Sequence, residues 1–168
     1  MKRFIKQLKE KYGYDEDVLK EVPGFYFLNE TEEITFVAHK GIGIPIRDEK
    51  GRISGIQVRR DVIEKDESRY IWFSSSFANE KEGMSCGTGS GSPIHVSYPE
   101  RFERKNDIFI TEGVFKSEQL AKTVNAIALS IQGIHGWRGK VSRVIDYLEE
   151  EKGLGVLYIH VMFDSDIC

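Results

Sequence analysis

The spacing of apolar residues changes along the chain, from a helical repeat to an alternating repeat and then to longer apolar runs. In the first twelve residues, Phe4, Ile5 and Leu8 fall on one helical face among lysines, which predicts a short amphipathic helix. "DEDVLKEV" predicts one or two further helical turns. Period-two alternation then predicts a small antiparallel sheet. Its expected strands are FYFL, EITFVA, GIGIPIRD, RISGIQVRRD and SRYIWFSS.

The second half alternates between buried strands and helices. The segments "DIFITEG", "AIALS" and "VLYIHVMF" predict three buried strands. Two amphipathic helices are expected between them, the first with Phe115, Leu120 and Val124 on or near one face, the second in "KVSRVIDYLEEEKG". This order predicts a parallel sheet with right-handed crossovers. The fold class is α/β (α+β overall), with an amino-terminal domain over 1–98 and a second domain over 99–168.

Residues 78–93, "ANEKEGMSCGTGSGSP", form a polar, glycine-rich loop with little expected ability to pack. Such a loop cradles phosphate in some proteins and is a mobile linker in others. It lacks the order of strand, loop and Lys-Ser/Thr found in a phosphate-binding P-loop, so the linker is favoured.

Composition restricts the function classes. The 168 residues carry a net charge of −3, so no global field attracts nucleic acid and any such contact requires local patches. The two cysteines, Cys86 and Cys168, lie far apart, which argues against a disulfide framework or a zinc site and fits a reducing cytoplasm. The amino terminus does not resemble a signal peptide, and no apolar run is long enough to cross a bilayer, so we expect a cytoplasmic protein without a membrane partner.

Three acids follow the predicted parallel strands. Glu112 comes directly after the first strand, in "ITEG", and Asp164 and Asp166 come after the third, in "FDSD". Ligands gather at the carboxyl ends of such strands, and clustered carboxylates suit Mg²⁺ (or Mn²⁺). The residues alone leave two interpretations open, a metal site and a chance accumulation of acids at strand ends.

At these positions the chain resembles the toprim domain of bacterial primases, topoisomerases and some nucleases. The resemblance rests on "ITEG" and "FDSD" in that order with two crossovers between them. Upstream, "GIGIPIRDEKGRISGIQVRRD" and "SRYIWFSSS" resemble the amino-terminal lobe of the primase catalytic core. Replicative primases usually carry an acid a few residues after the Glu-Gly, where this chain has Lys116. That form looks closest to toprim-like replication proteins of phages, plasmids and integrative elements.

The resemblance implies a role for each acid. Asp164 and Asp166 would hold magnesium, and Glu112 would be a further metal ligand or a general acid/base; the alternative for Glu112 is a favourable charge at the start of the next helix. The implied function is metal-dependent nucleotidyl transfer on a DNA template, with single-stranded DNA and nucleotides as partners and a helicase as a separate or fused partner.

Two other function classes stay open, a non-catalytic replication-accessory domain and a toprim nuclease. A complete toprim domain would continue past Cys168 with a helix and usually a strand. Two explanations are open, a degenerate toprim domain and a fragment of a longer protein truncated at its carboxyl terminus. We expect the fragment, which need not be active by itself. Two cysteines cannot build the zinc-binding domain common in primases.

Basic residues supply the candidate nucleic-acid contacts. Four arginines match family positions for template or nucleotide, although a solvated sheet face balanced by nearby acids explains them equally well. Three further basic residues stand at or near predicted helix starts, where phosphate binds readily. The alternatives are an ion pair with the nearby acids for the first of them and, for each of the other two taken singly, a solvated loop, which is favoured. The candidates are Arg47, Arg59, Arg60, Arg69, Lys116, Arg138 and Lys140. His39, His95 and His160 fall in strand patterns and are expected to be packed or paired.

Overall fold

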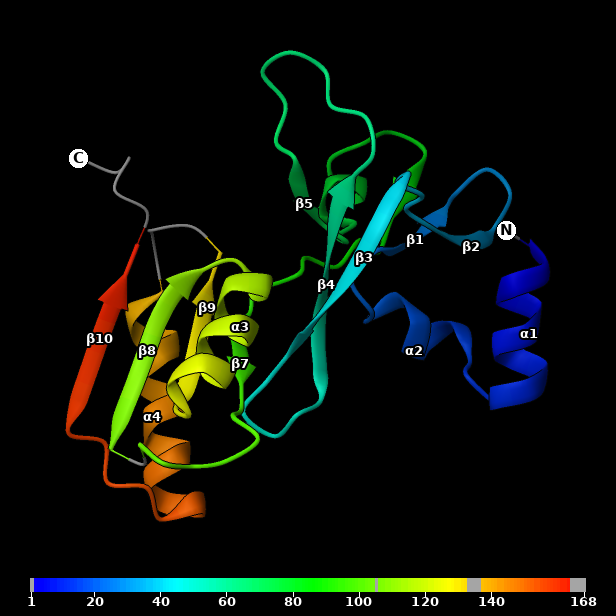
Figure 1. Ribbon diagram of the computed structural model, residues 1–168. Helices are drawn as coiled ribbons and strands as arrows, with labels where there is room; N and C mark the ends of the chain where they lie inside the picture. Colours follow the sequence, from blue (N-terminus) through cyan, green and yellow to red (C-terminus); the bar gives the residue numbers. More distant parts are fainter. Residues whose placement is uncertain (1, 105, 133–136, 164–168) are drawn as a thin grey trace. The chain divides into compact units, whose positions relative to one another are not determined.

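The chain forms two compact units, which Figure 1 shows in a computed structural model that describes residues 2–104, 106–132 and 137–163. The first unit takes Met1–Ile44 and Gly55–Gly91, and the second takes Pro45–Ser54 and Ser92–Cys168. Residues 45–54, which form the tip of the hairpin between residues 41 and 60, are therefore counted with the second unit. This division follows contacts and differs from the domain boundary expected after residue 98, which stays a prediction.

The first unit contains short helices and two small sheets. The strand orders are β2-β1-β6 and β3-β4-β5, and the first of these sheets and the β4–β5 pair are antiparallel. The sequence predicted the antiparallel strands but not their division between two sheets. The elements are α1 (Lys2–Tyr12), α2 (Glu16–Lys20), β1 (Phe25–Leu28), β2 (Glu33–Phe36), β3 (Gly41–Arg47), β4 (Ile53–Arg60), β5 (Tyr70–Trp72), a 3-10 helix η1 (Ser76–Asn79) and β6 (Met84–Ser85).

A small apolar core holds α1, α2 and the first sheet together. It is built from buried Ile5, Leu19, Phe25 and Ile34. Helix α2 is held at its start by Asp15, whose carboxylate accepts a hydrogen bond of 2.9 Å from the backbone N–H of Val18. This N-cap satisfies one of the donors that a helix start leaves open.

The second unit is built on a four-stranded sheet in the order β10-β8-β9-β7. Strands β10, β8 and β9 run parallel, and β7 pairs antiparallel with β9 at one edge. The predicted fold class, antiparallel sheets followed by parallel strands flanked by helices, is confirmed. The elements are β7 (His95–Ser97), β8 (Asp107–Glu112), α3 (Val114–Val124), β9 (Ile127–Ile131), α4 (Arg138–Lys152) and β10 (Tyr158–Met162).

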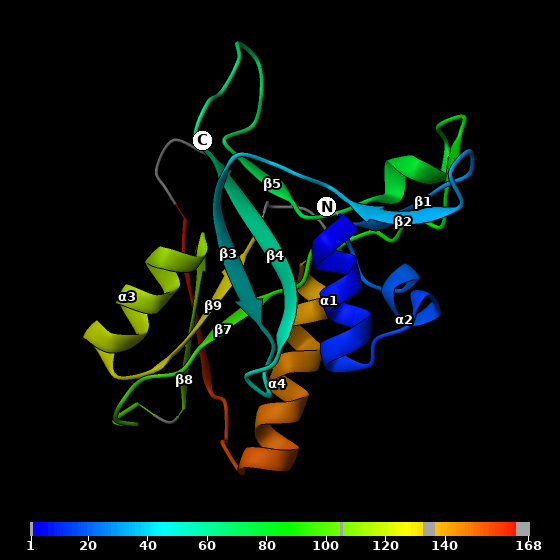
Figure 2. The same cartoon turned by 90° about the vertical axis from the view of Figure 1, so that its right-hand side faces the viewer.

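Helices α3 and α4 cover opposite faces of this sheet (Figure 2). Ile108 and Ile110 of β8 pack in one cluster with Leu148 of α4, whereas Phe109 packs in another with Ala121 of α3. Alternate residues of a strand point to opposite faces, so a strand covered on both sides is apolar almost throughout. The apolar runs of β8 and β9 therefore predicted their burial correctly.

The prediction of burial is wrong for β10. This strand lies at the edge of the sheet, and Ile159, Val161 and Met162 are each about half exposed. Phe115, expected to face inward from α3, is also exposed, because Val114, Ser117 and Ala121 take the buried face instead. Within the described residues, we find no helix with the length and apolar character needed to span a membrane.

Candidate functional site

Parallel pairing brings the carboxyl ends of β10, β8 and β9 to one edge of the second sheet (Figure 1). Glu112, the last residue of β8, is aligned with Ile131 of β9. The residue before it, Thr111, is aligned with Met162, the last residue of β10. The chain therefore leaves all three strands at nearly the same level, as the candidate site requires. We call this the carboxyl edge.

A glycine turn connects Glu112 to helix α3. Gly113 has φ 76° and ψ 138°, a backbone conformation that is favourable for glycine and strained for other residues. Its carbonyl accepts the hydrogen bond of 3.2 Å from the N–H of Ser117 that starts the helix. This turn leaves the Glu112 side chain half-buried at the edge of the sheet, where a carboxylate can meet both solvent and a ligand.

A buried polar network, which the sequence did not predict, fixes the start of α3. The N–H of Arg47 donates to Nδ1 of His95 at 3.0 Å, so the imidazole proton lies on Nε2, which donates to Glu118 at 2.8 Å. Ser97 donates to the same Glu118 oxygen at 3.2 Å and lies 2.9 Å from the hydroxyl of Ser117. The network ties β7 and the β3–β4 hairpin tip to the helix that follows Glu112.

The alternation of His95 and Ser97 in "IHVS" was the available signal for this network, because both side chains point to one face of a strand. Their partners on α3 lie twenty or more residues further on and carry no local pattern. The histidine prediction is confirmed for two residues, His95 and His160. Nε2 of His160 lies 2.6 Å from the Asp107 carboxylate and its ring stacks on Phe109.

Three of the predicted basic residues lie near the carboxyl edge. Lys116 is exposed in the first turn of α3, and Arg138 begins α4 with its guanidinium 5.4 Å from the centre of the Trp137 ring. Lys140 donates a hydrogen bond of 2.8 Å to the Ser92 carbonyl. Helices that follow parallel strands run back along the sheet, so both helix starts stand at this edge.

The four predicted arginines do not form one cluster in the described contacts. The side chain of Arg47 turns back to the Gly51 carbonyl of its own hairpin, at 3.0 Å. Arg60 is paired with Glu67 at 2.5 Å, which partly neutralises its charge. Arg59 and Arg69 belong, like Arg60, to the first unit, so a basic groove shared with Glu112 stays a prediction.

The predicted metal ligands Asp164 and Asp166 lie outside the described residues. Among the residues that are described, no group of three or more His, Cys, Asp or Glu side chains is placed to hold a metal ion. Of the predicted metal site, the structure therefore describes only Glu112 and strand β10, which precedes the two aspartates in the sequence. Both magnesium and its ligand set stay predictions.

The glycine-rich loop packs more tightly than predicted. Ser75, which is fully buried, donates to the Phe25 carbonyl at 2.5 Å and accepts from the Thr88 N–H at 3.0 Å. The side-chain amide of Asn79 bonds both the carbonyl and the N–H of Gly87, at 2.7 and 2.8 Å. The expectation of little packing is thus wrong for this stretch, because Ser75 at the end of the predicted strand SRYIWFSS and Asn79 in the loop itself hold Thr88 and Gly87 through side-chain hydrogen bonds.

Comparisons with known proteins extend the description of the fold. No protein-family model matches the sequence, and no curated protein matches it. The similar solved structures include one of the Aquifex aeolicus primase (zinc binding and RNA polymerase domains) and one of a DNA primase domain from Pseudomonas aeruginosa. The first has 16% identity and a TM-score of 0.61, and the second 18% and 0.52.

The alignments cover 97% and 92% of this chain but 36% and 44% of the two solved chains, respectively. The chain thus spans less than half the length of the structures it resembles. At this level of identity the similarity concerns the fold. The chain has a fold of the kind seen in bacterial DNA primase domains.

Proposed function

We propose that this chain is the nucleotide-binding and template-binding part of a primase-type DNA replication protein with a toprim domain. The observation that carries the proposal is the parallel pairing of β8 with β10, because both strands end at the carboxyl edge, where Glu112 closes β8. Asp164 and Asp166 follow β10 in the sequence, and we propose that they join Glu112 there. The similarity in fold to primase domains supports the same assignment.

The donor set fits a hard divalent cation. Glu112 offers a half-buried carboxylate at the carboxyl edge, and the two aspartates would add two more. Asp164 and Asp166 would hold Mg²⁺ or Mn²⁺, with Glu112 as a third ligand or as the general acid/base toward a 3′-hydroxyl. When bound, the ion would offset negative charge on nucleotide phosphates.

Cationic and N–H groups of this chain would bind the phosphates. The starts of α3 and α4 present backbone N–H groups to this edge, and Lys116, Arg138 and Lys140 bring positive charge to it. In the first unit, Arg59 and Arg69 are proposed to contact the template phosphates, with a weaker contribution from the paired Arg60. A helicase, fused or separate, is the proposed partner of the whole protein.

We also propose that the gene for this protein belongs to a mobile genetic element. Lys116 takes the place of the acid that replicative primases usually carry after the Glu-Gly. This substitution supports a relationship to replication proteins of phages, plasmids and integrative elements.

Template-directed incorporation of labelled ribonucleotides tests the proposal. The whole protein that contains this chain, with Mg²⁺ and a single-stranded DNA template, is expected to make short RNA products. Glu112→Gln should lower the rate by about a hundredfold or more, because loss of a group that acts on the reacting atoms costs this much or more. Glu150→Gln, the same change at an exposed position of α4, is the matched control and should leave the rate unchanged.

The outcomes distinguish the function classes. Equal rates in wild type and Glu112→Gln would contradict the assigned role. Binding of single-stranded DNA without metal dependence and without synthesis would identify a replication-accessory domain instead. Metal-dependent cleavage of DNA that Glu112→Gln removes would identify a nuclease.

A further inference from the structure

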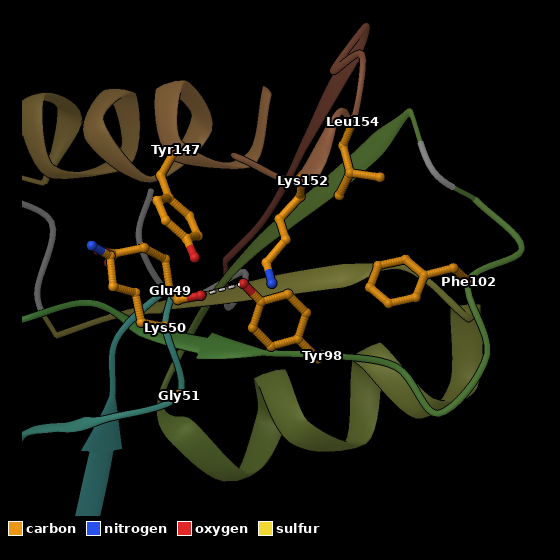
Figure 3. Close-up of a pocket in the computed structure, with 8 residues that line it drawn as sticks. All are labelled: Glu49, Lys50, Gly51, Tyr98, Phe102, Tyr147, Lys152 and Leu154. Atoms are coloured by element: carbon orange, nitrogen blue, oxygen red, sulfur yellow. Dashed lines mark hydrogen bonds between the residues drawn. The ribbon is translucent and has the colours of Figure 1, made fainter. Parts of the chain in front are cut away.

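A pocket of about 540 Å³ lies in the second unit, away from the carboxyl edge (Figure 3). Phe102 precedes β8 and Leu154 precedes β10, whereas Glu112 ends β8. The pocket therefore stands at the amino ends of the parallel strands. The six residues of β8 separate it from Glu112 by roughly 17 Å, from the usual rise per residue in a strand.

Aromatic rings form the walls of this pocket. The rings of Tyr98 and Phe102 are tilted by 55° with their centres 6.2 Å apart, and Tyr147 of α4 stands across from them (Figure 3). The Tyr98 hydroxyl donates to the Glu49 carbonyl at 2.6 Å, so it holds the hairpin tip against the pocket. Burial, with smaller contributions from Tyr147, Glu49 and Asp48, raises the pKa of Tyr98 to about 12, so its phenol stays neutral.

Two lysines give the pocket positive charge. Lys152, at the end of α4, extends between Tyr147 and Leu154 toward Tyr98 (Figure 3). Within the described ranges its ammonium group makes no ion pair. The Lys50 ammonium lies 5.3 Å from the centre of the Tyr147 ring. An available cation beside flat apolar surfaces is a site for an anion that also carries an aromatic ring.

We propose that this pocket binds a phosphorylated nucleoside, with the base against the Tyr98, Phe102 and Tyr147 rings and a phosphate at Lys152. Aromatic side chains stack bases regardless of sequence, and lysine binds phosphate as a point charge. The volume falls within the range typical of small-molecule sites. The ligand is either a free nucleotide or one unit of a single-stranded nucleic acid, because both present the same chemistry.

The proposal is independent of the function assigned to the carboxyl edge. It uses none of the acids proposed to hold a metal, and binding here requires no divalent ion. The test is therefore made with the whole chain in EDTA, which removes any contribution of magnesium at Glu112.

Fluorescence of N-methylanthraniloyl-ATP (mant-ATP) reports on the site. Wild type is expected to bind the probe saturably in EDTA, and unlabelled ATP should displace it. Lys152→Gln and Phe102→Ala should each weaken binding about tenfold, through loss of the charged contact and of a stacking surface. Both residues are exposed, so the variants should keep the fold, which thermal unfolding verifies. Lys65→Gln, at an exposed lysine of the first unit, should change binding less than twofold.

Unlabelled oligothymidylate separates the two sources of the ligand. If it fails to displace mant-ATP, the ligand is a free nucleotide; if it displaces mant-ATP at a lower concentration than ATP does, the ligand is a nucleic-acid strand. The proposal is overturned if mant-ATP does not bind in EDTA, or if Lys152→Gln and Phe102→Ala bind it as wild type does. It is also overturned if Glu112→Gln abolishes this binding, because the probe would then report on the other edge.

Discussion

The turn between Glu112 and α3 gives a quantitative prediction. Gly113→Ala places a side chain on a residue with φ 76° and ψ 138°, a region that residues other than glycine rarely adopt. A Cβ built at this position meets no heavy atom of the described chain within 4 Å, so the change adds no collision. The whole cost is backbone strain, about 1–3 kcal/mol of the free energy of unfolding. For a chain of this size, each kcal/mol lowers Tm by about 2–4 °C.

Gly139 provides a matched control for this substitution. It is the second residue of α4, and a Cβ there also meets no heavy atom of the described chain within 4 Å. Its φ is not positive, so alanine should be neutral or stabilising by up to about 1 kcal/mol.

Thermal unfolding followed by circular dichroism compares the two variants with wild type. Gly113→Ala should unfold at a lower temperature than wild type, and Gly139→Ala should not. If Gly113→Ala unfolds at or above the wild-type temperature, the turn does not have the assigned conformation, and the placement of Glu112 loses its basis.

Three further predictions concern hydrogen bonds and protonation. The Tyr98 pKa of about 12 in the folded chain exceeds the unfolded value of 10.0, so its stabilising contribution is present below pH 10 and is lost as the pH rises toward 12. Tyr98→Phe should therefore unfold with a shallower alkaline loss of Tm, and an unchanged slope would contradict this. Burial acts to raise the pKa of Asp48, but hydrogen bonds from the Arg52 side chain and from the Arg52 and Lys50 N–H groups together lower it, so its contribution is lost as the pH falls below the usual aspartate range. Asp48→Asn should cost about 1 kcal/mol at pH 7, and the difference in Tm from wild type should shrink in acid; a difference that persists there refutes the assignment. Ser75→Ala should cost about 1–3 kcal/mol, because the Thr88 N–H loses its acceptor, whereas Ser76→Ala, at an exposed position, should cost little in the same melting experiment.

Local periodicity was sufficient to predict the strands and helices that bury their apolar residues against other strands and helices close to them in the chain. Strands β8 and β9 and helix α4 followed this rule, and Val141, Val144 and Leu148 are buried as their spacing requires. The same pattern cannot tell an edge strand from a central one. The apolar residues of β10 have the composition of a buried strand, yet a neighbouring strand covers only one of its sides.

Arrangements made by distant residues were not predicted. The strand pattern at His95 was recognised, but the place of β7 in the sheet was not, because it depends on pairing with β9. Phe102 lies in the charged segment "PERFERKND" and Tyr98 directly precedes it. Neither residue indicated a pocket, because the hairpin tip and α4, which complete its lining, are distant in the sequence. Their partners are supplied by chain segments some fifty residues away, and no local pattern records such contacts.

For the candidate site, the sequence predicted which strand ends carry the acids, but it did not predict how the surrounding side chains are paired. Order along the chain placed Glu112 and the two aspartates at one edge, and the parallel register of β8 and β10 agrees with that direction. The basic residues were harder to assign, because ion pairs with nearby acids determine how much of their positive charge is available to bind nucleic acid. Arg60 is engaged by Glu67, and nothing in the sequence distinguishes it from Arg59 in this respect.

Titration with Mn²⁺, followed by electron paramagnetic resonance of the free ion, measures the proposed metal site itself. Wild type should take up the ion saturably, and Glu112→Gln, Asp164→Asn and Asp166→Asn should each weaken uptake about tenfold or more, because each removes a charged oxygen ligand. Glu150→Gln should bind as wild type does. Uptake that is absent in wild type, or equal in wild type and all three variants, would contradict a metal site at the carboxyl edge.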